Sequence, residues 1–311
     1  MIEAWYRKVK ESVERVMVGQ DEPTFLLLVA LSAGGHALLE DVPGTGKTML
    51  ARSLAASLGL GFKRVQFTPD LMPSDLTGVN VWREGRFEFV PGPVFTHVLL
   101  ADEINRATPK TQAALLEAMA EGQVTTDGRT RRLGPPFFVI ATQNPVEMDG
   151  TFPLPEAQLD RFLMRLRLGY PSLEEEVAVL ERLRVAHPVE TLEAVSSPAE
   201  VREVQARVRQ VRVDPSLQRY VVAIVRATRE HEAVALGASP RAALSLQRAA
   251  MAAAALSGRG YVLPDDVKRV VHPVLEHRLL LRPEVRLEGV RPEHVVEAAL
   301  RAVAVPTEEL G

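Results

Sequence analysis

Residues 41–48 of this chain read DVPGTGKT, a spacing of glycine, lysine and threonine that suits a phosphate-binding loop. Gly44 and Gly46 have no Cβ, so the backbone N–H groups around them can turn inward and bind phosphate oxygens. Lys47 can then reach the β- and γ-phosphates of a nucleoside triphosphate, and Thr48 offers a hydroxyl to Mg²⁺. We therefore predict a nucleotide-binding segment that consists of Val42, Pro43, Gly44, Thr45, Gly46, Lys47, Thr48 and Met49.

The segments on either side of this loop predict the elements that position it. His36–Glu40 is typical of a short strand, and Thr48–Leu58 places leucines on one face of a helix. The N-terminus of that helix would point its positive dipole end at the phosphates. One residue departs from the usual loop pattern, because Asp41 occupies the position of the first glycine. Aspartate tolerates the unusual backbone angles of tight turns, so we expect the loop to keep its shape.

A second group of chemically useful residues follows the apolar run Val98–Ala101, which is typical of a parallel strand buried on both faces. The strand ends at Asp102 and Glu103, and ligands collect at this edge of an open α/β sheet. Successive strand residues point to opposite sides, so the two carboxylates can have different roles. We predict that Asp102 binds Mg²⁺ together with Thr48, partly through water, and that Glu103 accepts a proton from an attacking water. The alternative is a solvated acidic pair at the end of a strand.

Length and composition limit the classes of protein to which the chain can belong. Its 311 residues can form two domains, and a net charge of -3 with a pI near 6.2 argues against a dedicated nucleic-acid-binding protein. No run of about 20 apolar residues predicts a membrane span, and the polar start lacks the apolar core of a signal peptide. The absence of cysteine excludes disulfides and thiol catalysis and fits a cytoplasmic location. We predict no structural metal, because no zinc-ligand spacing is found among His36, His97, His187, His231, His272, His277 and His294.

The organisation of the chain changes near Tyr170. Before it, helical runs alternate with strand-like ones, which are His36–Glu40, Lys63–Phe67, Val98–Glu103, Phe137–Thr142 and Met164–Leu168. This alternation predicts a parallel sheet with helices on both faces over residues 1–170. After Pro171 we expect helices only, over Leu173–Arg184, Pro198–Gln210, Leu217–His231, Pro240–Ala255, Pro264–Leu280 and Glu293–Val303. Residues 171–311 are therefore predicted to form a helical lid domain.

Several short motifs occur in the order that AAA+ ATPases have. They are VGQ at 18–20, PGTGKT at 43–48, ADEINRA at 101–107, ATQNP at 141–145, LPEAQLDRF at 154–162 and GASPRA at 237–242. With GRGYVLPDDV at 258–267, they cover nearly the whole chain, which resembles the MoxR group of these ATPases. The resemblance implies an α/β core of the P-loop NTPase type, with a central parallel sheet flanked by helices, and a C-terminal all-α lid. It also implies ATP or ADP and Mg²⁺ as ligands.

The resemblance assigns roles to two further groups near the nucleotide. Asn144 resembles sensor 1, whose side-chain amide orients the attacking water, while an Asx-turn before Pro145 is the alternative. Val18, Gly19 and Gln20 resemble the segment that contacts adenine, and an ordinary loop is the alternative there.

Two arginines resemble residues that sense or complete the site. Arg161, in a helical segment that starts near Pro155, resembles an arginine finger that enters a neighbouring subunit's site and stabilises charge on the transferred phosphoryl group. Arg241 resembles sensor 2, an arginine at the start of a lid helix that touches the γ-phosphate. The alternatives are contacts with solvent or with nearby acidic residues, namely Asp160 or Glu156 for Arg161 and Glu232 for Arg241.

Two insertions in the core have the pattern of β-hairpins. Residues 71–93 contain an alternating segment around Glu84-Gly85 and resemble the helix 2 insert, with Trp82, Phe87 and Phe89 as candidate contacts for a client or for their own domain. Residues 122–135 turn at Asp127-Gly128 and resemble the presensor 1 hairpin. This hairpin is basic, and its arginines could contact nucleic acid, an acidic client surface or only solvent. They are Arg129, Arg131 and Arg132.

Three functions compete for this set of features. The first is a MoxR-type ATPase that assembles as a homo-oligomeric ring, a hexamer, and remodels protein clients as a chaperone or in metallocofactor insertion or complex maturation. A partner with a von Willebrand factor A domain is implied by the same resemblance. The second is a nucleic-acid motor, although no winged helix, zinc module or strongly basic domain is present. The third is a scaffold that binds nucleotide without hydrolysing it, which the complete set of hydrolytic residues disfavours.

Overall fold

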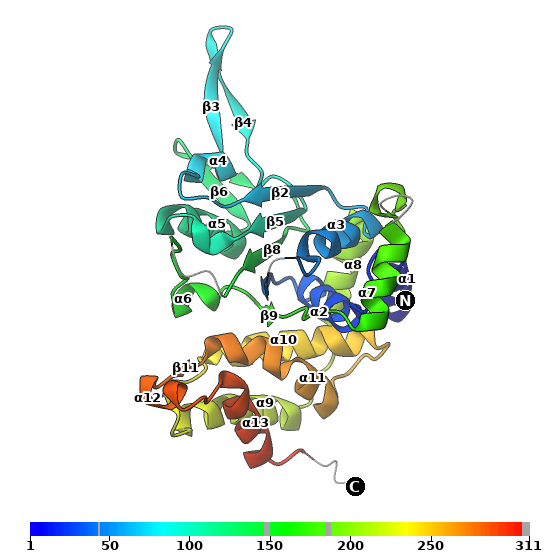
Figure 1. Cartoon of the computed structure of the whole chain (residues 1–311), viewed down its shortest axis with the longest axis vertical. Coiled ribbons are helices and arrows are strands. Elements are labelled where there is room, and N and C mark those ends of the chain that lie inside the picture. Colours follow the sequence, from blue (N-terminus) through cyan, green and yellow to red (C-terminus); the bar gives the residue numbers. More distant parts are fainter. Residues whose placement is uncertain (43, 146–149, 184–187, 307–311) are drawn as a thin grey trace.

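A five-stranded parallel sheet forms the centre of the first half of the chain. The computed structural model describes residues 1–42, 44–145, 150–183 and 188–306. The strands follow the order β2-β5-β8-β1-β9 (Figure 1). Each predicted strand is confirmed within about two residues at either end, with bounds β1 Ala37–Glu40, β2 Phe62–Gln66, β5 Val98–Asp102, β8 Phe138–Gln143 and β9 Met164–Leu166. Parallel pairing places all their carboxyl ends at one edge.

The two faces of this sheet are covered by separate apolar clusters. Leu39, Leu100 and Ile140 face one cluster, whereas their neighbours Leu38 and Leu99 face the other. This alternation follows from the two-residue period of a strand, and burial on both faces explains why the central runs are apolar throughout. The helices of this half are α1 Ile2–Glu14, α2 Asp21–Ser32, α3 Lys47–Ser57, α4 Pro73–Thr77, α5 Pro109–Glu121 and α6 Glu156–Leu159, with the 3₁₀ turn η1 Ile104–Arg106.

Helices dominate the second half, as the sequence predicts. They are α7 Leu173–Leu183, α8 Pro198–Val208, α9 Pro215–Glu230, α10 Pro240–Leu256, α11 Pro264–Leu275, α12 Pro283–Leu287 and α13 Pro292–Ala302, with 3₁₀ turns η2 Pro188–Thr191 and η3 Glu276–Arg278. Most start with proline at the first helical position, behind caps such as Ser197 and Ser239. Among the described helices, none combines the length and the apolar character needed to cross a bilayer.

Two details of the second half differ from the prediction. The helix expected over Pro264–Leu280 ends at Leu275, and the chain continues into η3. A short antiparallel pair is also present, formed by β10 Val234–Leu236 and β11 Leu280–Leu281. A strand of two residues gives no period that a sequence pattern could detect, which explains why only helices were expected.

The two halves share one apolar cluster. It runs from α1 and α2 to α10 and α11, where alanines such as Ala249 and Ala253 permit close packing. The segment before α8 also packs on the first half, because Val195 N–H donates to the carbonyl of Ser57 and Trp5 Nε1 lies 2.8 Å from Ser196 Oγ. In Figure 1, α7 and α8 lie beside α1 and α3, while α9 to α13 form a layer below them. A domain boundary at residue 170 therefore stays a proposal.

Both predicted hairpins are confirmed, and they lie side by side. The first consists of β3 Gly78–Arg83 and β4 Arg86–Pro91, and the second consists of β6 Gln123–Thr126 and β7 Arg129–Arg132. Their turn residues Glu84-Gly85 and Asp127-Gly128 all have positive φ, as this type of two-residue turn requires. Asn80 donates to Asp127 across the pair, and the Arg131 guanidinium lies 3.7 Å from the centre of the Phe89 ring.

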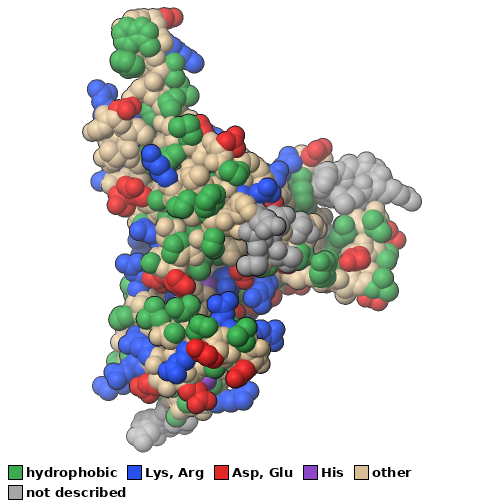
Figure 2. Space-filling view, turned by 60° about the vertical axis from the view of Figure 1, so that its left-hand side comes forward, with side chains coloured by type: hydrophobic (Ala, Val, Ile, Leu, Met, Phe, Trp, Pro, Cys, Tyr) green, Lys and Arg blue, Asp and Glu red, His purple; other side chains and the backbone are tan. Residues whose placement is uncertain are grey.

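The first hairpin projects far from the body of the protein (Figure 1). Trp82 and Phe87 stack edge to face at 4.9 Å, yet both remain exposed, at 61% and 71%. Figure 2 shows hydrophobic side chains gathered at the tip of this projection. Phe89 instead packs on Phe95 and Arg131. The three aromatic residues therefore have different environments, with one packed on its own domain and two at the tip.

Candidate functional site

The polar residues singled out in the sequence converge at the carboxyl edge of the sheet. The phosphate loop follows β1, while Asp102 and Glu103 end β5, and Asn144 follows β8. These strands are neighbours in the order β5-β8-β1, so the three chain segments meet at one place. Asn144 is buried and has an interaction partner. The edge therefore combines a phosphate loop, two carboxylates and an amide.

The phosphate loop has the backbone conformation that glycine permits. Gly44 and Gly46 have φ angles of 88° and 86°, and Gly46 immediately precedes α3. A Cβ on Gly46 would lie 3.3 Å from the terminal carbon of Met17, so a side chain there would narrow the loop. Thr48 lies in the first turn of α3, with the N-terminal N–H groups of that helix. Pro43, also predicted to bind nucleotide, lies outside the described residues.

Lys47 lies over the loop rather than away from it. Its Nζ donates to the carbonyl oxygens of Asp41 and Val42, at 2.6 and 2.9 Å. Burial lowers the pKa of Lys47, while the carboxylates of Asp41, Asp102 and Glu103 oppose this effect. A triphosphate would provide a better partner for this partly desolvated ammonium group than two carbonyl oxygens do.

Asp41 does not adopt the unusual backbone angles of a tight turn, which the sequence led us to expect. Among the described non-glycine residues, only Glu84, Glu103 and Asp127 have positive φ. Asp41 instead uses its carboxylate as a hydrogen-bond acceptor. Oδ1 accepts from the N–H of Val42 at 2.8 Å, and Oδ2 accepts from the N–H groups of Leu168 and Gly169 at 2.9 and 2.8 Å. The residue therefore connects the phosphate loop to the chain that follows β9.

Asp102 is held by two polar neighbours on adjacent strands. Thr142 Oγ1 donates to Oδ1 at 2.6 Å, and Arg64 donates to Oδ2 from Nε at 3.0 Å and from Nη2 at 2.6 Å. The carboxylate is nearly buried, so these contacts offset its desolvation. Asp102 and Thr48 would hold Mg²⁺, because a carboxylate and a hydroxyl are oxygen ligands of the kind that this ion prefers. The donor set thus fits the metal that the sequence predicts.

Glu103 leaves the strand in a strained conformation. Its φ and ψ angles are 55° and 51°, in the left-handed region that non-glycine residues rarely adopt. Its backbone N–H donates to Thr142 Oγ1, and its Oε2 accepts from Gln66 Nε2 at 2.6 Å. Arg106 lies 3.4 Å from the same oxygen. The turn directs Glu103 away from Asp102, which gives the two carboxylates separate environments.

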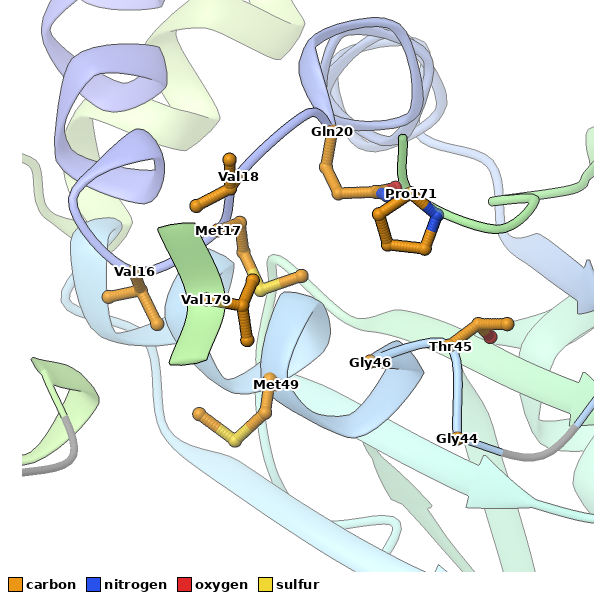
Figure 3. A pocket seen from close by; sticks show the side chains of 10 residues that line it. All are labelled: Val16, Met17, Val18, Gln20, Gly44, Thr45, Gly46, Met49, Pro171 and Val179. Carbon is orange, nitrogen blue, oxygen red and sulfur yellow. The ribbon is translucent and has the colours of Figure 1, made fainter. Parts of the chain in front are cut away.

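A cavity of about 240 Å³ adjoins the phosphate loop. Figure 3 shows side chains from the α1–α2 connection on one side, Gly44 to Gly46 on another, and α7 across the opening. The walls are mostly apolar, and they comprise Val16, Met17, Val18, Gln20, Gly44, Thr45, Gly46, Met49, Pro171 and Val179. An apolar cavity beside a phosphate loop suits the flat base of a nucleotide.

Gln20 brings a polar side chain to the lining of this cavity. Its side chain is nearly buried, and Oε1 is an acceptor without a hydrogen-bond partner. Such an atom costs free energy unless a donor reaches it, and the exocyclic amino group of adenine is a donor. Val18, which the resemblance assigns to the adenine contact, also lines the cavity. Gly19 permits close packing, because a Cβ there would lie 2.0 Å from a Glu175 carboxylate oxygen.

Arg161 and Arg241 lie at the opposite edge of the sheet. Arg161 precedes β9, and the Leu163 N–H donates to the His36 carbonyl, just before β1 begins. Arg241 starts α10 and lies 3.7 Å from Asp160 Oδ2, next to Arg161 in sequence. Both arginines therefore lie at the amino edge, away from the phosphate loop of their own chain. Their side chains extend toward solvent, although Arg161 Nη1 also donates to the Leu116 carbonyl.

The position of Arg161 corrects one detail of the prediction. The helix that starts after Pro155 is α6, and it ends at Leu159, so Arg161 lies in the turn that follows. The chain leaves the helix because Asp160 and Phe162 bind Arg278 of the second half. Arg278 donates to Asp160 Oδ1 at 2.6 Å and to the Phe162 carbonyl at 2.7 Å. The predicted alternative of an ion pair with Asp160 is realised by Arg241, not by Arg161.

Three residues that hold the two carboxylates were not predicted from the sequence. Arg64 and Gln66 alternate on β2, and Thr142 lies near the end of β8. A polar residue at every second position of a strand next to the acidic strand is a usable signal, but it requires the strand order. If the predicted strand Phe137–Thr142 is placed beside the acidic strand, its last residue, Thr142, lies next to Asp102, so this residue could have been predicted.

Comparisons with known proteins agree with this geometry. Residues 36–164 match the model described as "ATPase family associated with various cellular activities (AAA)", and residues 226–299 match an "AAA lid domain". The chain is 45% identical to "Chaperone MoxR1" of Mycobacterium tuberculosis, over 94% of this chain and 80% of that one. It is 35% identical to "Protein MoxR" of Paracoccus denitrificans, over 97% of each chain.

Solved structures give the same result. A candidate ATPase from Cytophaga hutchinsonii superposes with a TM-score of 0.92 at 41% identity, and the match covers 98% of this chain and 97% of that one. A full-length MCM homologue from Methanopyrus kandleri matches with a TM-score of 0.60 at 19% identity, over 90% of this chain and 61% of that one. The latter likeness concerns the fold alone.

Proposed function

Because the chain belongs to the MoxR family of AAA+ ATPases, we propose that it hydrolyses ATP at the carboxyl edge of its sheet. One observation carries the proposal: the phosphate loop, Asp102, Glu103 and Asn144 meet at this edge, next to a mostly apolar cavity of about 240 Å³. The orphaned Oε1 of Gln20 favours adenine, whose amino group donates, over guanine, which presents a carbonyl at the same place.

The residues of this edge have distinct roles in the proposed reaction. The loop N–H groups and Lys47 bind the phosphates, and Asn144 orients the attacking water. Glu103 accepts the proton from that water. Mg²⁺, when bound by Thr48 and Asp102, supplies positive charge that neutralises the phosphate oxygens. Arg64 pairs with Asp102 in the present structure, so it must share this carboxylate with the metal.

We also propose that a second copy of the chain completes the site. Arg161 and Arg241 lie at the amino edge, and the four residues of β1 separate the two edges by about 13 Å. Neither arginine can reach the phosphates of its own chain across that distance, whereas both can enter a neighbour's site. A head-to-tail contact of this kind generates a closed ring when the rotation closes, and a hexamer is the size that the family resemblance implies.

The work performed by the ring is proposed to be the remodelling of protein clients. The relative named "Chaperone MoxR1" supports this class of activity. The exposed pair Trp82 and Phe87 at the end of the projecting hairpin gives the ring an aromatic surface for unfolded or partly folded chains. Metallocofactor insertion or complex maturation, a partner with a von Willebrand factor A domain and a cytoplasmic location belong to the same proposal.

The test of the proposed function uses Glu103→Gln. We expect this variant to bind ATP with unchanged affinity while turnover falls by about two to four orders of magnitude, because the proton acceptor is lost and the phosphate contacts remain. ATP affinity is measured by calorimetry, and turnover is measured by phosphate release. The matched control is Glu288→Gln, an exposed position at the end of α12 that should behave as the wild type.

The same variant tests the client. Held with ATP, Glu103→Gln should retain clients and partner proteins on affinity capture, and mass spectrometry identifies them. Retention of single-stranded DNA instead of protein would favour the motor. Unchanged phosphate release by Glu103→Gln would remove this residue as the proton acceptor.

A further inference from the structure

We propose that the Asp41 carboxylate is a positioning group that couples the phosphate loop to the wall of the base cavity. The inference rests on the proposed binding of adenine nucleotides and goes beyond it, because it assigns a role to a residue that touches neither phosphate nor base. Asp41 occupies the position of the first glycine of the loop pattern, and its φ angle is not positive. The backbone therefore does not require glycine there, and a side chain is available for another use.

The carboxylate contacts two segments of the chain, its own loop and a segment that begins at Leu168, 127 residues from Asp41. Oδ1 accepts from the N–H of Val42 within the loop, and Oδ2 accepts from both Leu168 and Gly169. An ionised carboxylate with three N–H donors forms charge-assisted hydrogen bonds, which are about twice as strong as neutral ones. The carbonyl of the same residue accepts from Lys47 at 2.6 Å. Asp41 is thus connected to the phosphate-binding lysine at one end and to the segment after β9 at the other.

That segment forms the base-side wall. Two residues after Gly169, Pro171 lines the cavity, and Val179 of α7, further along the same segment, also lines it (Figure 3). Gly169 itself has a φ of 70°, so the chain turns sharply where the Asp41 carboxylate holds it. α7 then approaches the opposite wall, because the Glu175 carboxylate packs against Gly19. Movement of the phosphate loop is transmitted through Asp41 to the position of Pro171 and α7.

Glycine at this position would break the connection. The N–H groups of Leu168 and Gly169 would lose their shared acceptor, and the wall would be free to move without the loop. The order that bound phosphate gives to the loop would then contribute less to the free energy of binding the base. Asparagine, in contrast, keeps one oxygen that can accept from the N–H groups of both Leu168 and Gly169, while its NH2 group replaces the oxygen that accepts from Val42 and the charge is removed.

The experiment compares two probes in three proteins. Dissociation constants for ADP and for inorganic pyrophosphate, both with Mg²⁺, are measured by displacement of a fluorescent ADP analogue from the full-length wild type, Asp41→Gly and Asp41→Asn. We expect Asp41→Gly to bind ADP about tenfold more weakly, because Leu168 and Gly169 lose their acceptor and the net effect of this loss on binding is about that of a single hydrogen bond. Its affinity for pyrophosphate should be unchanged or higher, because a negative charge near the phosphates is removed. Asp41→Asn should keep the wild-type ratio of the two constants within about twofold.

The ratio distinguishes coupling from a purely structural role. A distorted loop weakens both probes together, so an unchanged ratio in Asp41→Gly would overturn the inference even if ADP affinity falls. If the ratio of the ADP and pyrophosphate dissociation constants changed in Asp41→Asn as much as in Asp41→Gly, the role could not be assigned to the oxygen that Leu168 and Gly169 share. If the wild type binds ADP and the ratio does not change, only the inference about Asp41 fails. If the wild type binds neither probe, the proposed function fails as well.

Discussion

At the scale of single residues, the buried histidine His36 predicts that the stability of the fold depends on pH. His36 is nearly buried between the sheet and α5, where Nδ1 accepts from the Val139 N–H at 3.0 Å and Nε2 lies 3.1 Å from the Met119 carbonyl. Because Nδ1 is an acceptor, Nε2 carries the proton and the ring is neutral. A second proton on Nδ1 would face an N–H group. Burial accordingly lowers the pKa of His36 to about 4.

This lowered pKa makes acid destabilising. An unfolded histidine has a pKa of about 6.5, so the unfolded chain binds the proton first as the pH falls. The contribution of His36 to stability is complete above pH 6.5 and is lost progressively between about pH 6.5 and pH 4. Between pH 7.5 and pH 5, the wild type should lose about 2 kcal/mol more than His36→Gln, which cannot titrate. Urea unfolding at both pH values measures this, and equal losses in the two proteins would contradict it.

At the scale of elements, one buried arginine joins the two halves of the chain. The Arg278 side chain is 2% exposed and pairs with Asp160 at 2.6 Å. Arg278 also donates to a backbone carbonyl in each half of the chain, that of Leu163 before β9 and that of Val274 in α11. Since Arg161 lies between Asp160 and Phe162, these contacts determine where the proposed trans-acting arginine projects. A change in the position of η3 would therefore move Arg161.

We expect Arg278→Met to act on both stability and turnover. Removing one partner of a buried ion pair leaves the other desolvated, so the free energy of unfolding should fall by about 3 kcal/mol. ATP turnover should fall further than ADP affinity does, because Arg161 is displaced while the carboxyl edge is intact. Denaturant unfolding, phosphate release and ADP titration measure these effects. Arg286→Met, at an exposed arginine of α12, is the control, and equal effects in both variants would refute the role of Arg278.

The elements themselves follow from the sequence more directly than their contacts do. The apolar runs before Asp102 and Asn144, the glycines of the phosphate loop and the Asp127-Gly128 turn each indicate a local conformation, and the structure has those conformations. Arg278, by contrast, belongs to a segment that was expected to be helical, because its period continues that of α11. Its partners in the first half, Asp160, Phe162 and Leu163, are more than 100 residues away. Local patterns carry no information on such a pairing, which also applies to Asp41 and Leu168.

At the scale of the whole molecule, the separation of the two edges implies that one chain holds two different half-sites. The carboxyl edge is the proposed nucleotide site, and the amino edge presents Arg161 and Arg241. α7, beside the nucleotide cavity, exposes Leu173 and Leu180 at 73% and 72% and carries acidic residues in its first turn. An acidic, partly apolar surface next to the cavity is complementary to a neighbour that approaches with arginines. The contact is head to tail, so each copy would use both edges.

Mixing of inactive variants measures this arrangement. Lys47→Ala removes the phosphate lysine, whereas Arg161→Ala and Arg241→Ala each remove one arginine, and each variant alone should be inactive. In a ring mixed in equal amounts from Lys47→Ala and Arg161→Ala, about one quarter of the sites combine an intact lysine with an intact neighbouring arginine, so about a quarter of wild-type turnover should return. A mixture of Arg241→Ala and Lys47→Ala should recover the same fraction of turnover. The reason is that Arg241 lies beside Asp160, at the same amino edge as Arg161. If Arg241 acted on the phosphates of its own chain, no site in that mixture would be complete, and phosphate release would stay at background.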